Sequence, residues 1–381
     1  MSVLVVSPRY APHPGGIEKL LAQVLPELRA EGLDVVVATG TEDGTAAADA
    51  VDGVPVYRLP FSQAVNSGRA GEMLRVAALL REVERDHSVK VRHVHGFGDI
   101  GLWYVWRDHR RNPKPLGISV HGTLDPIGPI AATGAALLSA AQVVSAVSDA
   151  VAASVSTAVP ACAGRLRVIR NGIRPDGGDL DPSLPRGHLL AVGRLDDQKG
   201  FDVAIEAVAI LQPTYPDIQL IIVGHGHGHA ALRDRAVLTG VAARVQIVDS
   251  LPEPDVAALM RTASAVLVPS RTMEGFSLVA LEAAQAARPV VASRVGGIPE
   301  TVEDGVSGIL VAPDDPAALA AGIDRLLSNP SLADRMGLAG QRRARSHYDL
   351  GRCVAEYRDL YRDLFAHCSQ DQPLERASSR A

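Results

Sequence analysis

Hydrophobic residues gather in short, continuous runs along the first half of the chain. Each run is bounded by turn residues, and helical periodicity follows several of them, as over Ile17–Glu31. Consecutive apolar positions predict strands buried on both faces, which is typical of parallel sheets covered by helices. The predicted strands are Val3–Val6, Asp34–Ala38, Val91–Val94, Leu116–Val120, Val143–Ala146 and Arg167–Ile169.

The same pattern starts again after residue 188. Strands are predicted at Leu189–Val192, Leu220–Val223, Val245–Val248, Ala265–Val268 and Val290–Ala292, with helices between them. The intervening segment Arg174–Gly187 is rich in Pro, Gly and Asp, which favours a linker. The pattern therefore predicts an α/β protein with two doubly wound, Rossmann-like parallel-sheet domains. Motifs in the strand-to-helix loops of both would face a shared cleft.

The domain bounds follow from these elements. We expect an N-terminal domain over residues 1–180 and a C-terminal domain over residues 187–350. A helix is predicted over residues 352–365, and we expect it to pack back on the N-terminal domain. Residues 366–381 are mostly polar and are expected to form a disordered tail.

Composition narrows the range of partners and compartments. Apolar residues make up 47% of the 381 residues, enough for two sizeable cores, and the formal charge of −5 argues against nucleic acid or an anionic membrane as partner. Three widely spaced cysteines indicate reduced thiols rather than a disulfide framework. The sequence shows neither a secretory signal at Met1 nor a long apolar stretch, so a cytoplasmic protein is expected.

The segment from Val268 to Ala284 is the most informative for chemistry. A buried strand is followed by a loop with Glu274 and Gly275, and a helix is predicted to begin near Ser277. The free N–H groups of a helix start form a seat for a diphosphate. Glu274 is then placed to accept hydrogen bonds from sugar hydroxyls, and Glu282 to reach a ribose. Two glutamates eight residues apart often occur by chance and do not by themselves indicate a binding site. The interpretation therefore depends on their position in a strand–loop–helix unit.

A second loop, Val192–Phe201, follows the first strand of the second half. Arg194 offers a planar fork of donors and Lys199 a compact charge, a combination suited to diphosphate oxygens. Only four of the 38 basic residues are lysines, and one of them is at this loop. We therefore interpret the loop as a diphosphate-binding element, the alternative being solvated charges at a helix start.

Two weaker signals lie in the first half. Gly15 and Gly16, in the loop after the first strand, would let the backbone approach a phosphate or sugar closely. His121 follows the strand Leu116–Val120 and could position a sugar hydroxyl, although a lone histidine is as often structural.

The loop with His225, His227 and His229 is interpreted differently. Its Gly-x-Gly-x-Gly pattern is not the dinucleotide fingerprint Gly-x-Gly-x-x-Gly, and no cysteine or carboxylate cluster accompanies the histidines. We predict a flexible loop and no metal site.

Taken in order, the motifs resemble those of the retaining glycosyltransferases of family 4, glycosyl transferases group 1, which have the GT-B fold. The resemblance extends to about residue 365. The matching positions are Gly15–Gly16, His93–Gly96, His121–Gly122, Asn171–Ile173, Gly193–Gly200, the pair Glu274 and Glu282, and Gly296–Glu300 with Gly308.

This resemblance implies a nucleoside-diphosphate sugar donor, a UDP-sugar being the first expectation, held mainly by the C-terminal domain. Arg194 and Lys199 would neutralise the diphosphate, Glu282 would bind the ribose, Glu274 would hold the transferred sugar and His121 would support it. The donor would also contact the Gly15–Gly16 loop and Gly275, Phe276, Ser277 and Leu278, with phosphate at the amides of the last two.

The resemblance further implies transfer with retention at the anomeric carbon by front-face displacement, without a metal or cofactor. We expect a small acceptor with hydroxyl groups, such as a sugar, a cyclitol or a natural-product core. A lipid-linked or cell-envelope acceptor is the next alternative, followed by a GT-B phosphorylase or epimerase, a nicotinamide-dependent oxidoreductase and a non-catalytic binding module. The Val223–His227 loop departs from the family's Val-Gly-x-Gly-Pro pattern, so the sequence leaves the base and sugar open, as it does the oligomeric state.

Overall fold

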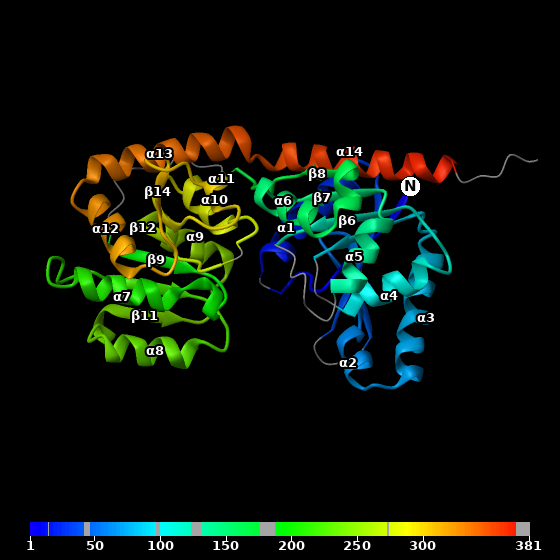
Figure 1. Cartoon of the computed structure of the whole chain (residues 1–381), viewed down its shortest axis with the longest axis horizontal. Helices are drawn as coiled ribbons and strands as arrows, with labels where there is room; N and C mark the ends of the chain where they lie inside the picture. The colour runs from blue at the N-terminus through cyan, green and yellow to red at the C-terminus, as the bar shows by residue number, and fades with distance from the viewer. Residues whose placement is uncertain are drawn as a thin grey trace, which may run out of the picture.

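The computed structural model describes residues 1–13, 15–41, 46–96, 100–122, 131–175, 187–272 and 274–370. Two α/β domains lie side by side along the long axis of the molecule (Figure 1). Helix α13 (Pro330–His347) runs along the C-terminal domain, and α14 (Leu350–Gln370) continues along the same edge of the N-terminal domain. The end of the chain therefore spans both domains.

The N-terminal domain is built on an eight-stranded sheet with the order β3-β4-β2-β1-β5-β6-β7-β8. Its strands are β1 Ser2–Ser7, β2 Asp34–Gly40, β3 Ala47–Val51, β4 Val54–Leu59, β5 Val91–His95, β6 Leu116–Val120, β7 Val143–Ala146 and β8 Leu166–Val168. Its helices are α1 Gly16–Ala30, α2 Phe61–Asn66, α3 Ala70–Asp86, α4 Ile100–His109, α5 Ala131–Ala140 and α6 Asp149–Ala158, followed by the 3-10 turn η1 Pro160–Arg165.

Both faces of this sheet are covered, which is why β1 has a continuous apolar run. In β1, Val3 and Val5 pack with α1 and α14, whereas Leu4 and Val6 join the core beneath helices of the other face. All described strand pairs are parallel except β3–β4. That hairpin was not predicted, because four of the five residues of β3 are exposed and present no apolar run.

The C-terminal domain is built on a six-stranded parallel sheet with the order β11-β10-β9-β12-β13-β14. Its strands are β9 His188–Val192, β10 Leu220–Val223, β11 Val245–Val248, β12 Ala263–Val268, β13 Val290–Ser293 and β14 Gly308–Val311. Its helices are α7 Phe201–Leu211, α8 His229–Leu238, α9 Glu253–Thr262, α10 Leu278–Gln285, α11 Ile298–Thr301 and α12 Pro316–Leu327, with 3-10 turns η2 Asp197–Lys199 and η3 Ala242–Arg244.

The two sides of β9 show how this second sheet is buried. Leu189 and Ala191 pack in the core of α7 and α12, whereas Leu190 packs with residues of α9 and α10. Such burial requires the continuous apolar runs seen in the sequence. The predicted parallel strands of both halves are therefore present, and β14 is an additional strand at the sheet edge.

One prediction about the chain end is wrong. The polar tail was expected from residue 366, but α14 continues to Gln370. His367 Nδ1 lies 2.9 Å from the carbonyl oxygen of Asp363, one turn earlier, and the Cys368 side chain packs against the core of α1 and α14. These contacts extend the helix beyond the predicted end. Residues 371–381 and most of the predicted linker, 176–186, lie outside the described residues.

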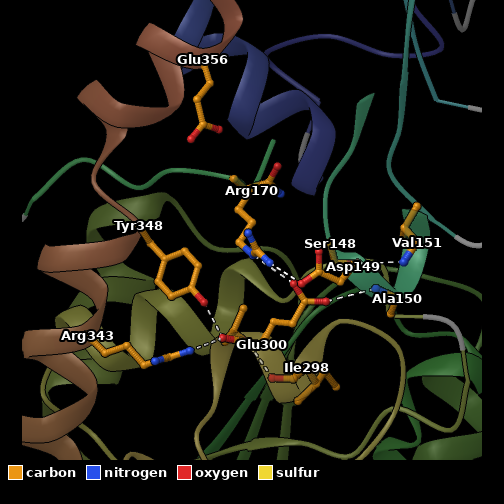
Figure 2. Close-up of polar contacts among 12 residues, drawn as sticks. Ser148, Asp149, Ala150, Val151, Arg170, Ile298, Glu300, Arg343, Tyr348 and Glu356 are labelled. Atoms are coloured by element: carbon orange, nitrogen blue, oxygen red, sulfur yellow. Dashed lines mark hydrogen bonds and ion pairs between the residues drawn. The ribbon is translucent and has the colours of Figure 1, made fainter. Parts of the chain in front are cut away.

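A cluster of polar contacts around Glu300 joins the two domains (Figure 2). From α11, its carboxylate accepts hydrogen bonds from the backbone N–H of Ala150 at 3.2 Å and from Arg170 Nε at 3.0 Å, both in the N-terminal domain. The carbonyl oxygen of Glu300 accepts from Arg343 at 2.9 Å and from the hydroxyl of Tyr348. Glu300 thus connects α6, α11 and the α13–α14 junction.

The helices offer no membrane-spanning segment within the described ranges, since none is both long and apolar enough to cross a bilayer.

Candidate functional site

Lys199 and Glu274, predicted from separate loops of the C-terminal domain, are in direct contact. Lys199 Nζ lies 2.6 Å from Glu274 Oε2, and the hydroxyl of Ser270 donates to the same oxygen at 3.1 Å. The Glu274 side chain is only 15% exposed. Its second oxygen, Oε1, makes no hydrogen bond within the described part of the chain. The ion pair therefore leaves one carboxylate oxygen for a ligand hydroxyl.

The two loops are held together by close backbone packing. Gly200 has φ 62°, and a Cβ at that position would lie 2.2 Å from the carbonyl oxygen of Pro269, so only glycine fits. The backbone N–H of Arg271 donates to the carbonyl oxygen of Gln198 at 2.8 Å. The Arg271 guanidinium also forms a two-pronged ion pair with Asp202. These contacts fix where Lys199 meets Glu274.

Arg194 stands apart from this pair. Its side chain is 64% exposed and lies 3.2 Å from Asp196 Oδ2, an acid in its own loop. The structure places Arg194 in the predicted loop but pairs it with a local carboxylate. Its exposure leaves the guanidinium accessible to an anionic ligand.

Helix α10 begins directly after Ser277, as predicted. The Ser277 hydroxyl accepts a hydrogen bond from the backbone N–H of Ala280 at 3.2 Å, which is an N-cap. Phe276 is buried and packs edge-on against Tyr348, with ring centroids 5.6 Å apart. The helix start is therefore anchored on both sides beside the Glu274 loop.

The Gly15–Gly16 loop of the N-terminal domain faces this helix start. A Cβ at Gly16 would lie 3.7 Å from Leu278 Cδ1, which places the two predicted donor-binding segments against each other. Gly15 adjoins the Glu18 carboxylate, and burial raises the pKa of Glu18 against the opposing charges of Arg9, His13 and Arg194. The loop thus brings residues of the N-terminal domain to the start of α10 in the C-terminal domain.

Glu282 has a partner that the sequence interpretation missed. Lys19, on α1, lies 2.5 Å from Glu282 Oε1 and 2.5 Å from Glu253 Oε1. Burial raises the pKa of Glu282, while Lys19 opposes that rise. Burial would lower the pKa of Lys19, but the two carboxylates outweigh it and raise that pKa. One lysine of the N-terminal domain is thus held by two acids of the other domain.

His121 meets the Glu274–Gly275 loop through its backbone. A Cβ at Gly275 would lie 2.0 Å from the carbonyl oxygen of His121, so the two loops touch across the domain boundary. The ring Nε2 lies 3.0 Å from Nδ1 of His95. Burial lowers the pKa of His121 to about 4, so the imidazole is neutral near neutral pH.

Gly275→Ala is expected to lower the transfer rate about tenfold or more, because overpacking of about 1–3 kcal/mol opposes the present domain contact. The added methyl would collide with the His121 carbonyl of the other domain, so the melting temperature should change little. Initial rates and thermal unfolding together test this. Gly164→Ala, which meets nothing within 4 Å in the described chain, is the control. An unchanged rate would show that the contact is not needed.

The free energy of unfolding is expected to fall as pH drops below about 6.5. Burial lowers the pKa of His93 to about 3 and of His121 to about 4, and that of His95 well below 6.5. As the pH falls, the unfolded chain therefore binds protons before the folded one does. Each imidazole then lowers the free energy of unfolding by about 1.4 kcal/mol per pH unit, and the three together lower it by up to about 4 kcal/mol per unit.

Urea unfolding between pH 7 and 5 measures this loss. His93→Asn should flatten the dependence on pH. Stability that stays level over this range would contradict the neutral state of the three imidazoles.

The His225–His229 loop packs on the Arg194 loop. A Cβ at Gly224 would lie 1.8 Å from the carbonyl oxygen of Gly193, and Gly228 N–H donates to the Leu195 carbonyl at 2.8 Å. Its glycines therefore serve close backbone packing. Over the described ranges, no group of three or more histidine, cysteine or acidic residues is placed to hold a metal ion. Metal independence stays a prediction.

A pocket of about 310 Å³ lies at the amino ends of β9 and β10, where His188, Tyr215 and Asp217 line it. Lys199 and Glu274 follow the carboxyl ends of β9 and β12, at the opposite edge of the same sheet. Open α/β sheets bind ligands at the carboxyl edge. This pocket is therefore separate from the candidate site.

Two family descriptions match the chain, one for each domain. Residues 14–176 match "Glycosyltransferase Family 4", and residues 183–343 match "Glycosyl transferases group 1". The predicted loops around Gly15, Lys199 and Glu274 fall within these matches.

Curated relatives carry related names. The glycogen synthase of Mycobacterium tuberculosis is 36% identical over 214 residues, 55% of this chain and 51% of the relative. The D-inositol 3-phosphate glycosyltransferase of Acidothermus cellulolyticus is 38% identical over 187 residues, 47% of this chain and 41% of the relative. The match thus spans about half the length of these curated relatives or less.

Among solved structures, Anabaena HepE in complex with UDP-glucose superposes with a TM-score of 0.79 at 20% identity, covering 95% of this chain and 99% of that one. This likeness concerns the fold. The two family matches, one in each domain, indicate a group 1 glycosyltransferase, and the likeness to the solved structure shows the GT-B fold.

Proposed function

We propose that this protein transfers a sugar, with retention of anomeric configuration, from a nucleoside-diphosphate donor to a hydroxyl of a small acceptor. The Lys199–Glu274 ion pair at the start of α10 carries the proposal, because it sets a cation and a carboxylate side by side. The cation would bind the diphosphate, and the carboxylate would accept hydrogen bonds from hydroxyls of the transferred sugar. A UDP-sugar is our first choice of donor, supported by the complex of Anabaena HepE with UDP-glucose.

The leaving group would be stabilised from two directions. Lys199 would approach the diphosphate oxygens, with Arg194 available from the exposed side of the same loop. The N-terminus of α10 adds the positive end of its dipole. Fixed positive charge where negative charge develops is the largest single contribution that a protein makes to this kind of displacement.

Glu274 would hold the sugar rather than attack it. Its Oε2 accepts from Lys199 and Ser270, so that oxygen is neutralised and committed. The acceptor oxygen would form its bond to the anomeric carbon on the face from which the diphosphate departs. The acceptor proton would pass to a diphosphate oxygen, which gives a glycoside and a nucleoside diphosphate. This reaction step requires neither a protein nucleophile nor a metal.

Glu282 would bind the ribose, with Lys19 as its partner before the nucleotide arrives. The two side chains are packed between the domains, beside Leu20, Ile173 and Leu278. Ribose hydroxyls would replace the ammonium as donors to the carboxylate. A small acceptor with several hydroxyls, such as a cyclitol, is consistent with the name of the D-inositol 3-phosphate glycosyltransferase relative.

A thermal-shift panel of nucleotide sugars, followed by a mass-spectrometric acceptor screen with the best donor, tests the proposal. We expect one nucleotide-sugar class to stabilise the protein and the product to be heavier than the acceptor by one sugar. The new glycosidic bond should have the same anomeric configuration as the donor. Lipid-linked acceptors belong in the same screen. Sugar transfer from a sugar 1-phosphate with release of inorganic phosphate, without nucleotide, would instead identify a phosphorylase.

A further inference from the structure

A line of buried polar side chains crosses the N-terminal domain from α14 to His121. His93 and His95 lie two residues apart on β5 and thus point to the same face of the sheet, toward α14. On the neighbouring strand, Gly117 pairs with His93, and a Cβ there would lie 2.8 Å from Leu364 of α14 and 3.2 Å from the His93 ring. The absence of a side chain at Gly117 makes room for the line.

Hydrogen bonds connect these side chains without interruption. The hydroxyl of Tyr361 lies 2.8 Å from His93 Nδ1, and His95 Nε2 lies 3.3 Å from the same nitrogen. His95 Nδ1 in turn lies 3.0 Å from His121 Nε2. At the side, His93 Nε2 lies 2.9 Å from the hydroxyl of Ser119. His93, His95 and Ser119 are fully buried, and Tyr361 is 2% exposed.

The three imidazoles are neutral near neutral pH, because burial lowers the pKa of each. A neutral imidazole has one N–H and one bare nitrogen, so each contact between two rings needs one donor and one acceptor. The tautomer of one histidine therefore determines that of the next along the line.

Tyr361 determines which nitrogen donates and which accepts in each hydrogen bond of the line. Within the described part of the chain, its hydroxyl has His93 Nδ1 as its one hydrogen-bond partner, so the phenol proton is satisfied by donation to that nitrogen. His93 then carries its proton on Nε2 and donates to Ser119. A bare His95 Nε2 would set two lone pairs 3.3 Å apart, so His95 carries its proton on Nε2, shares the His93 Nδ1 acceptor with Tyr361 through a longer and weaker hydrogen bond, and accepts at its own Nδ1. His121 is the donor to that Nδ1, through its own Nε2.

We propose that Tyr361, acting through His93 and His95, fixes His121 as the tautomer with its proton on Nε2 and a bare Nδ1 that accepts a hydrogen bond from a hydroxyl of the transferred sugar. The sugar contact rests on the proposed function, whereas the tautomer does not. Tyr361 and His95 are positioning residues in this scheme. They lie in the domain core and act on the ligand through His121.

The direction of the line has a chemical consequence at the donor site. The carbonyl oxygen of His121 lies against the Glu274–Gly275 loop, so this residue borders the proposed sugar site. A bare nitrogen selects an O–H donor there, and the neutral ring adds no positive charge near the anomeric carbon. The opposite tautomer would present an N–H, which would reverse that hydrogen bond and make the sugar hydroxyl its acceptor.

Nuclear magnetic resonance of the full-length protein with ¹⁵N-labelled histidine tests the tautomer. The His121 signals are assigned by their loss in His121→Gln, and their nitrogen shifts report which ring nitrogen carries the proton. Tyr361→Phe removes the phenol proton that sets the direction. Tyr357→Phe is the matched control, because Tyr357 is equally buried on α14 and its ring packs 5.8 Å from that of His95, but it makes no hydrogen bond to the three described imidazoles.

We expect the wild type and Tyr357→Phe to show a proton on His121 Nε2 only, and Tyr361→Phe to show both tautomers. With the best donor and acceptor, Tyr361→Phe should lower kcat about two- to tenfold, as for one misdirected hydrogen bond, with unchanged UDP affinity. A wild-type proton on Nδ1, or a Tyr361→Phe spectrum identical to wild type, would overturn the proposal. Absence of sugar transfer by a wild type with the expected spectrum would contradict the proposed function instead.

Discussion

Lys199→Ala is expected to lower kcat for sugar transfer about 10²- to 10³-fold, or roughly 2.7–4 kcal/mol, the cost of removing one fixed donor to a developing oxyanion. Lys199 is held by Glu274 and by the tight turn at Gly200, so its charge is in place before the donor binds. Steady-state kinetics with saturating donor measure the effect. The KM for the donor should change less than kcat, because the negative charge on the leaving group increases in the transition state.

A second lysine serves as the control for Lys199→Ala. Lys90→Ala removes a lysine at an exposed position just before β5 and should leave kcat within about twofold of wild type, as surface changes far from a site do. If Lys199→Ala retains wild-type kcat, as Lys90→Ala is expected to, Lys199 does not serve the leaving group.

Glu282→Ala is expected to weaken nucleoside-diphosphate binding about 10- to 100-fold, because hydrogen bonds to a charged group contribute about 1.5–3 kcal/mol each. The reason is loss of the carboxylate proposed to hold the ribose, from a side chain only 17% exposed. Isothermal titration with UDP checks the prediction. An enzyme that uses inorganic phosphate in place of a nucleotide would show no such dependence on Glu282.

Glu253→Ala is the matched control for Glu282→Ala. Glu253 contacts the same lysine at the same 2.5 Å, but its side chain is 69% exposed and outside the Glu274–Glu282 segment. Both variants remove one carboxylate from Lys19, and only Glu282→Ala removes a proposed ribose ligand. Equal losses of UDP affinity in the two variants would assign the effect to Lys19 and the domain contact rather than to the ribose.

Much of the fold was predictable because both sheets are buried on two faces. Burial of that kind leaves continuous apolar runs, which mark β1, β6 and β10 in the sequence as clearly as in the structure. The exposed strand β3 has no continuous apolar run, so the sequence does not predict it. The helical stretch from 366 to 370 was missed for a similar reason, because one partly buried residue, Cys368, is too little to define a helical face.

The site was predictable where motif and backbone geometry coincide. The start of α10 at Ser277 and the meeting of Lys199 with Glu274 follow from strand–loop–helix units that end at one sheet edge. Lys19 was missed, although it is one of only four lysines and follows the Gly15–Gly16 loop by three residues. Its partners belong to the other domain, and a contact between domains leaves no local pattern in the sequence.

The buried line from Tyr361 to His121 could not be predicted for the same reason, because it joins residues far apart in the sequence. The His93 and His95 spacing was visible on a predicted strand, but their partner lies 268 residues from His93. Alternation along β5 predicts that the two rings share a face, and only the packing of α14 shows what covers them.

The most direct test of the donor site is isothermal titration of UDP, GDP and ADP into the wild type and into the double variant Lys199→Ala/Glu282→Ala. The proposed site predicts that at least one nucleoside diphosphate binds the wild type. Its affinity should fall at least about 100-fold in the double variant, as expected for two charged contacts. Binding to the double variant as tight as to wild type would contradict a donor site built on Lys199 and Glu282.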